Sequence, residues 1–186
     1  MEHVTEKPAR KSGNGKRRQI AALPWRGEGE ALEILLVSSR ETKRWVIPKG
    51  WPMKGRTDPA AAAQEAYEEA GLDGVVSQTP VGEYEYLKRL KNGTARQVRV
   101  DVFPLKVTGE HATWPEIGQR TLHWMKPVEA ALAVQEAELR DLIARFAGVT
   151  LPEEERPAPI RPPTPVKVAL QRLRRRVITL WGRPRR

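Results

Sequence analysis

Three glutamates within one short segment are the residues of this sequence best suited to chemistry. Glu68 follows Glu65 by three positions and Glu69 follows it by four, so on a helix their side chains share one face. No Lys or Arg lies in 59–72 to balance them, and like charges at this spacing repel one another. A bound cation would remove the repulsion. Oxygen ligands favour Mg²⁺ or Mn²⁺, and the sequence has no Cys for a soft site.

The segment that carries these carboxylates has the start and stop signals of a helix. We expect Asp58 to be its N-cap, Pro59 to be the first helical residue and Gly71 to end it. The alternative for an acidic run is a solvated helix face without any metal. A glycine loop around Gly50, followed by a capped helix, three carboxylates and a terminal glycine, favours the metal site.

The stretch 50–72, GWPMKGRTDPAAAAQEAYEEAGL, resembles the signature of the Nudix hydrolase family. That signature is a glycine, then a glutamate, then an R-E-x-x-E-E-x-G run. The matching residues here are Gly50, Glu65, Glu68, Glu69 and Gly71. The resemblance implies that the Gly50 carbonyl and the three glutamates are metal ligands for Mg²⁺, with Mn²⁺ as an alternative. It also implies that the glutamates are catalytic, with Glu65 as the candidate base.

Two positions depart from the family pattern. Arg56 stands where the family has its first glutamate, and Gln64 stands where it has its arginine. The first change removes an outer ligand or hydrogen-bond acceptor, and the second removes an ion pair that orients the loop against the helix. Both changes bear on the rate and the substrate range, while the three glutamates that metal binding needs are retained.

Flanking segments resemble one branch of the family, the diphosphoinositol polyphosphate phosphohydrolase-like branch of bacterial type. The segments are 38–50 (SSRETKRWVIPKG) and 113–126 (TWPEIGQRTLHWMK). The resemblance implies that basic residues in them bind substrate phosphate, namely Arg40, Arg44, Lys49 and Arg120. Glu116 is a candidate further metal ligand or base. For Arg40 the alternative is a polar hairpin tip.

Cations beyond the glutamate helix add to this phosphate-binding set. The loop 88–99 carries Lys88, Arg89, Lys91, Arg96 and Arg99. Such side chains pair with phosphate oxygens, and we favour Arg89 and Arg96 as substrate contacts. The alternative is protection of an edge strand by charge.

The expected fold class is α/β (α+β), a Nudix fold with a mixed β-sheet sandwiched between helices. Apolar runs predict strands at 19–24 and Glu33–Ser38. A β-hairpin is predicted over 81–107, turning at Asn92-Gly93. Helices are expected at 127–134 and 136–146, the second with an apolar face.

The chain of 186 residues is long enough for one well-packed domain. We assign a disordered basic arm to 1–16, the Nudix domain to 17–149, a Pro-rich linker to 150–165 and a basic amphipathic tail helix to 166–186. The formal net charge is +10, and it comes from the two ends, which leave the middle of the chain nearly neutral.

The tail helix, 166–186, is not explained by the family resemblance. An anionic membrane surface and a protein partner are candidate targets for it, and nucleic acid ranks below both. Packing on its own domain or on a second subunit is an equal alternative to the membrane. The sequence has no span long and apolar enough for a bilayer and no signal-peptide core. We therefore expect a cytoplasmic protein, with peripheral membrane attachment as an option.

The sequence predicts a Mg²⁺-dependent Nudix pyrophosphohydrolase, an enzyme that cleaves a phosphoanhydride bond in a highly phosphorylated small molecule. A diphosphoinositol polyphosphate or a dinucleoside polyphosphate fits the density of Arg and Lys. Two alternatives remain open. One is a catalytically weak regulatory module that binds a nucleotide or phosphorylated ligand, and the other is an RNA 5′ pyrophosphohydrolase.

Overall fold

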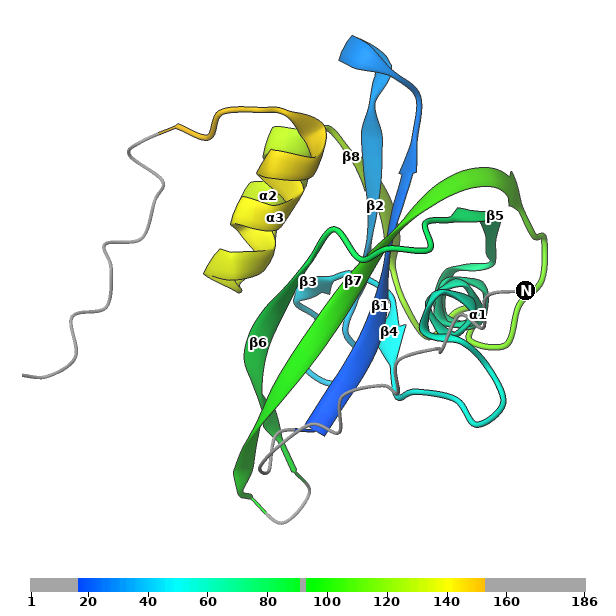
Figure 1. Cartoon of the computed structure of the whole chain (residues 1–186), viewed down its shortest axis with the longest axis vertical. Helices are drawn as coiled ribbons and strands as arrows, with labels where there is room; N and C mark the ends of the chain where they lie inside the picture. The colour runs from blue at the N-terminus through cyan, green and yellow to red at the C-terminus, as the bar shows by residue number, and fades with distance from the viewer. Residues whose placement is uncertain (1–16, 91–92, 153–186) are drawn as a thin grey trace, which may run out of the picture. The chain divides into compact units, whose positions relative to one another are not determined.

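The computed structural model describes residues 17–90 and 93–152 (Figure 1). The strands are β1 (Arg17–Arg26), β2 (Glu33–Ser38), β3 (Trp45–Val46), β4 (Lys49–Gly50), β5 (Leu72–Val76), β6 (Gly82–Arg89), β7 (Ala95–Glu110) and β8 (Leu122–Met125). The helices are α1 (Asp58–Ala70), α2 (Pro127–Ala133) and α3 (Ala137–Ala147), and a short 3₁₀ helix, η1, spans Gly29–Ala31. No helix in this part of the chain is both long and apolar enough to cross a membrane.

All the strands of the described chain belong to one mixed sheet. Its order is β3-β2-β1-β7-β5, and β4 also pairs with β1, β6 with β7 and β8 with β2. β1 and β7 run parallel, whereas the other strand pairs are antiparallel. The predicted α/β (α+β) class with a mixed sheet is therefore confirmed.

The sheet separates two apolar cores because its central strands are buried on both faces. In β1, Ile20 and Ala22 face α1, while Ala21 and Leu23 face the opposite side. Leu139, Leu142 and Ile143 of α3 pack on that opposite side. Figure 1 shows α1 on one side of the sheet and α2 with α3 on the other. Helices therefore cover both faces of the sheet, and this close packing supports the side chains at the sheet edges.

The helix that carries the glutamates begins one residue earlier than expected. Thr57, not Asp58, is the N-cap, and the Thr57 hydroxyl accepts a hydrogen bond from the Ala60 amide at 3.4 Å. Asp58 is the first helical residue, and its carboxylate pairs with Arg18 at 2.6 Å. The prediction of Asp58 as the cap was wrong because Thr and Asp both cap well and stand side by side here. Gly71 ends the helix as predicted.

The predicted hairpin is confirmed as β6 and β7, which pair from Gly82↔Val102 to Arg89↔Ala95. The Leu90 amide donates to the Thr94 carbonyl at 2.8 Å, which closes its end. Asn92, the arm 1–16, most of the linker and the tail helix 166–186 lie outside the described residues.

Candidate active site

The close contact between Gly50 and Glu65 fixes the first part of the site. β4 pairs with β1 through Ile20↔Gly50, which holds residue 50 against α1. A Cβ atom on residue 50 would lie 1.8 Å from the Glu65 Oε1 atom, far inside van der Waals contact. Only glycine therefore leaves space for the Glu65 carboxylate. This carboxylate has no hydrogen bond to any other residue that the structure describes.

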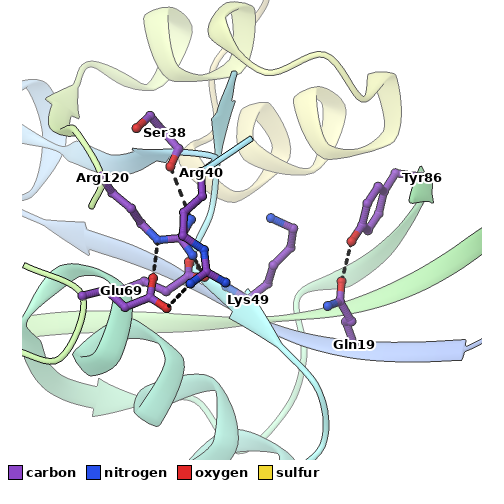
Figure 2. Close-up of polar contacts among 8 residues, drawn as sticks. Gln19, Ser38, Arg40, Lys49, Glu69, Tyr86 and Arg120 are labelled. Carbon is purple, nitrogen blue, oxygen red and sulfur yellow. Dashed lines mark hydrogen bonds and ion pairs between the residues drawn. The ribbon is translucent and has the colours of Figure 1, made fainter. Parts of the chain in front are cut away.

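Glu69 is held by an ion pair with Arg120, and both side chains are almost fully buried. The Lys49 amide donates to the other oxygen of Glu69 at 3.3 Å. Arg120 also donates to the Glu116 carboxylate at 2.7 Å and to the Ser38 carbonyl at 3.3 Å (Figure 2). Arg120 thus ties helix α1 to the end of β2 and to the loop that precedes β8.

Glu68 faces the loop 111–121 and interacts with Gln64. Gln64 Nε2 donates to Glu68 Oε1 at 2.7 Å, one helical turn away. The Glu116 amide donates to the Glu68 carbonyl at 3.0 Å, so the loop is fastened to the helix by backbone. Where the family has an arginine, this chain therefore places a neutral amide on Glu68.

Both the backbone conformation at residue 71 and the side chain packed against it require glycine. It has a φ of +68°, in the left-handed region that favours glycine. A Cβ on it would lie 2.6 Å from the Trp114 ring. The glycine at the end of the motif therefore also lets the loop 111–121 pack against α1.

The carboxylates form an acidic cluster whose negative charge is only partly balanced by Arg120 and Lys49. Burial raises the pKa of Glu65 to about 7, with repulsion from Glu69, Glu68 and Glu116 as further causes. Burial also raises the pKa of Glu69, although Arg120 and Lys49 oppose that shift. A cation near these groups would lower both pKa values and keep the carboxylates ionised.

The residues present fit a hard divalent cation by their donor chemistry. The carboxylate oxygens of Glu65, Glu68 and Glu69 and the Gly50 carbonyl are all-oxygen ligands of the kind that Mg²⁺ takes. The raised pKa of Glu65 and the close approach of its carboxylate to Gly50 agree with this. Within 17–90 and 93–152, however, no three carboxylates or imidazoles already converge as a metal site. Glu69 is paired with Arg120 and Glu68 with Gln64, so these carboxylates must reorient to share an ion.

A cavity of about 560 Å³ opens beside Glu69. Basic side chains dominate its charged lining, and they are Arg40, Arg44, Lys49, Lys88, Arg89 and Arg120. Five of the six cations predicted to bind substrate are in this set. The sixth, Arg96, does not line the cavity and lies opposite Lys88 in the β6–β7 register.

The cations of the cavity divide into two groups by their partners. Arg40 pairs with Glu116 at 3.2 Å, Arg44 with Glu136 at 2.8 Å, and Arg120 with Glu69. Lys49, Lys88 and Arg89 make no ion pair with another described residue. Burial lowers the pKa of Lys49 to about 8, although Glu69 and Glu136 favour its charged form. The cavity therefore holds positive charge that its own walls do not balance.

Sequence reasoning did not select several polar residues of the wall. Gln19, Gln135 and Tyr86 were not among the predicted site residues, and Lys88 was named among the loop cations without being favoured as a substrate contact. The Tyr86 hydroxyl donates to Gln19 Oε1 at 2.6 Å, and Lys49 lies between this pair and Glu69 (Figure 2). Tyr86 shares a strand face with the buried Tyr84, and that alternation was the available signal.

The NUDIX domain model matches residues 15–146, which is more than half of the chain. The chain therefore belongs to the Nudix family. Nudix hydrolase 12, mitochondrial, of Arabidopsis thaliana is 38% identical over 104 residues, covering 53% of this chain and 50% of the relative. Diphosphoinositol polyphosphate phosphohydrolase 3-alpha of Mus musculus is 32% identical over 124 residues, covering 65% of this chain and 71% of the relative.

Solved structures show the same fold at lower identity. The E. coli dihydroneopterin triphosphate pyrophosphohydrolase has a TM-score of 0.54 at 20% identity, over 71% of this chain and 96% of that one. The C. elegans Ap4A hydrolase has a TM-score of 0.53 at 18% identity, over 72% of this chain and 98% of that one. The chain spans only half the length of the first Arabidopsis thaliana relative and 63% of the length of Nudix hydrolase 13.

Proposed function

We propose that this protein is a metal-dependent pyrophosphohydrolase that cleaves a phosphoanhydride bond in a highly phosphorylated small molecule. One observation carries the proposal: the acidic Glu69 and a surplus of cations line a single cavity. Polyanions are attracted by such a cavity, and the neighbouring Glu65, Glu68 and Gly50 supply oxygen ligands for Mg²⁺ or Mn²⁺. A bound cation would supply charge neutralisation at the bridging oxygens and an activated water.

The chain's own residues have separate tasks in this proposal. Lys49 and Arg89, which lack ion-pair partners among the described residues, bind substrate phosphates. Arg44 is held by Glu136, and Arg120 is held by Glu116 and the Ser38 carbonyl, so both orient the phosphates by their fixed positions. Glu65 accepts the proton of the attacking water, because its carboxylate makes no hydrogen bond to another described residue and is free to act as a base.

The substrate class that we favour is a diphosphoinositol polyphosphate or a dinucleoside polyphosphate. Both carry several phosphates on a compact frame, which suits a cavity of about 560 Å³ with six basic side chains. The names of two similar proteins, the mouse phosphohydrolase and the C. elegans Ap4A hydrolase, agree with these two classes.

A regulatory module that binds its ligand without useful turnover is the second candidate. The pairing of Glu69 with Arg120 and of Gln64 with Glu68 favours it, because both carboxylates are occupied by protein partners. The third candidate, an RNA 5′ pyrophosphohydrolase, would use the basic ends of the chain and predicts strong salt dependence with RNA alone.

Phosphate release from a substrate panel tests the proposal. The panel holds diphosphoinositol polyphosphates, dinucleoside polyphosphates, ADP-ribose, nucleoside triphosphates and triphosphorylated RNA, each with Mg²⁺ and with a chelator. We expect Mg²⁺-dependent turnover of one of the first two classes. Binding without turnover of any member would favour the regulatory module, and turnover of RNA alone would favour the third candidate.

A further inference from the structure

Trp51 is an exposed aromatic residue beside the glutamate site, and two cations lie over its ring. It directly follows Gly50, and 39% of its surface is accessible to solvent. The Lys88 Nζ atom lies 5.0 Å from the ring centroid, and the Arg17 guanidinium carbon lies 5.7 Å from it. A cation over an aromatic ring is attracted by the negative face of the ring. The indole therefore restricts where these two flexible side chains lie.

A third cation shares this end of the sheet. Lys88 lies opposite Arg96 in the β6–β7 register, and Arg17 lies opposite Val98 of the same strand. Side chains alternate along strands, so Arg17, Lys88 and Arg96 lie on the sheet face that carries Val98. The start of β1 and the end of the β6–β7 hairpin lie together in Figure 1. We call these three residues the outer basic cluster.

The outer basic cluster is not balanced by acids of the described chain. None of its members forms an ion pair with another described residue. Lys88 and Arg96 stand directly opposite each other, and like charges in that position destabilise a strand pair. An anion between them would turn this repulsion into attraction, and arginine pairs well with phosphate oxygens.

The cluster is continuous with the cavity that ends at Glu69. Lys88 belongs to both, because it lines the cavity and also lies over the Trp51 ring. A ligand with one phosphate near Glu69 and a chain of further phosphates would extend along the cavity to Lys88. Its remote phosphates would then reach the outer basic cluster.

We propose that Trp51 is a positioning residue that holds Lys88 and Arg17, together with Arg96, as an outer subsite for phosphates remote from the bond that is cleaved. The inference rests on the proposed function and adds to it a preference for long phosphate chains. Stacking of a nucleobase on Trp51 is the competing use of the ring. It is disfavoured because a base would have to displace a cation that already lies over the indole.

Equilibrium binding in the presence of a chelator tests the subsite without requiring catalysis. Calorimetric titrations would compare linear inorganic tripolyphosphate with an inorganic hexaphosphate chain for the wild type, Trp51→Ala, Trp51→Phe and Lys88→Met. We expect Trp51→Ala and Lys88→Met to weaken hexaphosphate binding about tenfold and tripolyphosphate binding by less than about twofold. Trp51→Phe should retain most of the affinity, because its ring still attracts cations.

A matched control comes from a second pair of the same kind. Lys106 Nζ lies 5.2 Å from the Trp25 ring centroid, and neither residue lines the cavity. Lys106→Met should therefore leave both affinities unchanged. An equal loss for short and long chains in Trp51→Ala, or no loss in it, would overturn the proposal.

A comparison of diadenosine hexaphosphate with the inorganic hexaphosphate distinguishes phosphate binding from base stacking. Trp51→Ala should weaken the binding of diadenosine hexaphosphate as much as it weakens the binding of the inorganic chain. A loss of affinity for the nucleotide alone would show base stacking and would overturn the proposal. In Mg²⁺, the variant should raise KM for the long substrate and leave kcat unchanged. If the wild type hydrolyses nothing, the proposed function fails, while the titrations still decide the subsite.

Discussion

At the scale of single residues, the site contains carboxylates that the fold buries close to one another, which destabilises their ionised forms. Glu65 is half-buried against Gly50 with three other carboxylates near it, and its pKa rises to about 7. Proteins accept such positions where function needs them, so a cluster of this kind marks a functional site. Its cost should be visible in the stability of the metal-free protein.

Glu65→Gln should make the metal-free protein more stable above neutral pH. The pKa of Glu65 is raised from 4.5 to about 7 in the folded state, so its contribution to stability is fully present below pH 4.5 and is lost as pH rises through about 7. The variant has no such loss. Thermal unfolding in a chelator from pH 5 to 9 measures this. A wild type and variant with the same pH dependence would contradict the assignment of the shift to Glu65.

Gly50→Ala should reduce activity much more than stability. The new Cβ would lie 1.8 Å from Glu65 Oε1, and the flexible end of Glu65 can rotate away. We expect a loss of unfolding free energy of about 1 kcal/mol or less and at least a tenfold loss in kcat/KM, equivalent to about 1.4 kcal/mol of transition-state stabilisation. Urea unfolding and steady-state kinetics on the same preparation check both values. Unchanged kcat/KM would show that the Glu65 position is not needed.

The sequence pattern predicted the residues of the site better than it predicted which residues contact one another in the folded chain. The spacing of Glu65, Glu68 and Glu69 predicts a shared helix face, because that spacing is local. The contact of Arg120 with Glu69 joins positions 51 residues apart, and only the folded chain brings them together. The same holds for Tyr86 with Gln19, since each comes from a different strand.

At the scale of elements, helix α1 positions the carboxylates and its end positions the loop above them. Gly71 combines a left-handed backbone with a close approach of Trp114. Gly55 has a similar φ of +78° but has no atom near enough to meet a Cβ. A comparison of substitutions at these two glycines therefore distinguishes the cost of backbone strain from the cost of a steric clash.

Gly71→Ala should destabilise the protein by more than Gly55→Ala does. Both substitutions force a non-glycine residue into the left-handed region, which costs about 1–3 kcal/mol. Only the change at Gly71 also brings a Cβ to 2.6 Å from the Trp114 ring. Urea denaturation of both variants gives the comparison. Equal losses of unfolding free energy would mean that Trp114 moves aside without cost.

Element existence was easier to predict than element boundaries. The strand Glu33–Ser38 is an apolar run and was predicted with its observed limits. β1 extends from Arg17 to Arg26, beyond the predicted 19–24, because pairing with β7 along most of its length continues past its apolar centre. β4 has only two residues, Lys49–Gly50, and its pairing with β1 has no local sequence signal.

At the scale of the whole molecule, net charge is a poor guide to the site. The formal charge of +10 comes mainly from the ends of the chain, outside the residues that the structure describes, apart from Arg17 and Arg18. What matters for an anionic ligand is the local surplus at Lys49, Lys88 and Arg89. Composition could not predict this, because it depends on which cations find acidic partners.

Substrate binding should weaken as ionic strength rises. The cavity is open to solvent and attracts a polyanion through several cations, and screening shortens the range of this attraction from about 8 Å at 0.15 M salt to about 3 Å at 1 M. We expect KM to rise steeply between these concentrations and kcat to change little. Steady-state kinetics in KCl measures this, and a constant KM would show that the basic lining does not attract the substrate.

The central claim is that the glutamate cluster holds a divalent cation that the reaction needs. Mn²⁺ binding, followed by electron paramagnetic resonance, tests it most directly when hydrolysis is measured in the same samples. The variants are Glu69→Gln and, as a control, Glu41→Gln, which removes a carboxylate from the same cavity but lies outside the cluster. Circular dichroism confirms that each is folded, since Glu69 also pairs with the buried Arg120.

We expect Glu41→Gln to bind Mn²⁺ and turn over substrate like the wild type. Glu69→Gln should bind Mn²⁺ at least about tenfold more weakly, a loss of ~1.4 kcal/mol, and should lose nearly all turnover. A folded Glu69→Gln protein with wild-type Mn²⁺ affinity and wild-type turnover would contradict the account.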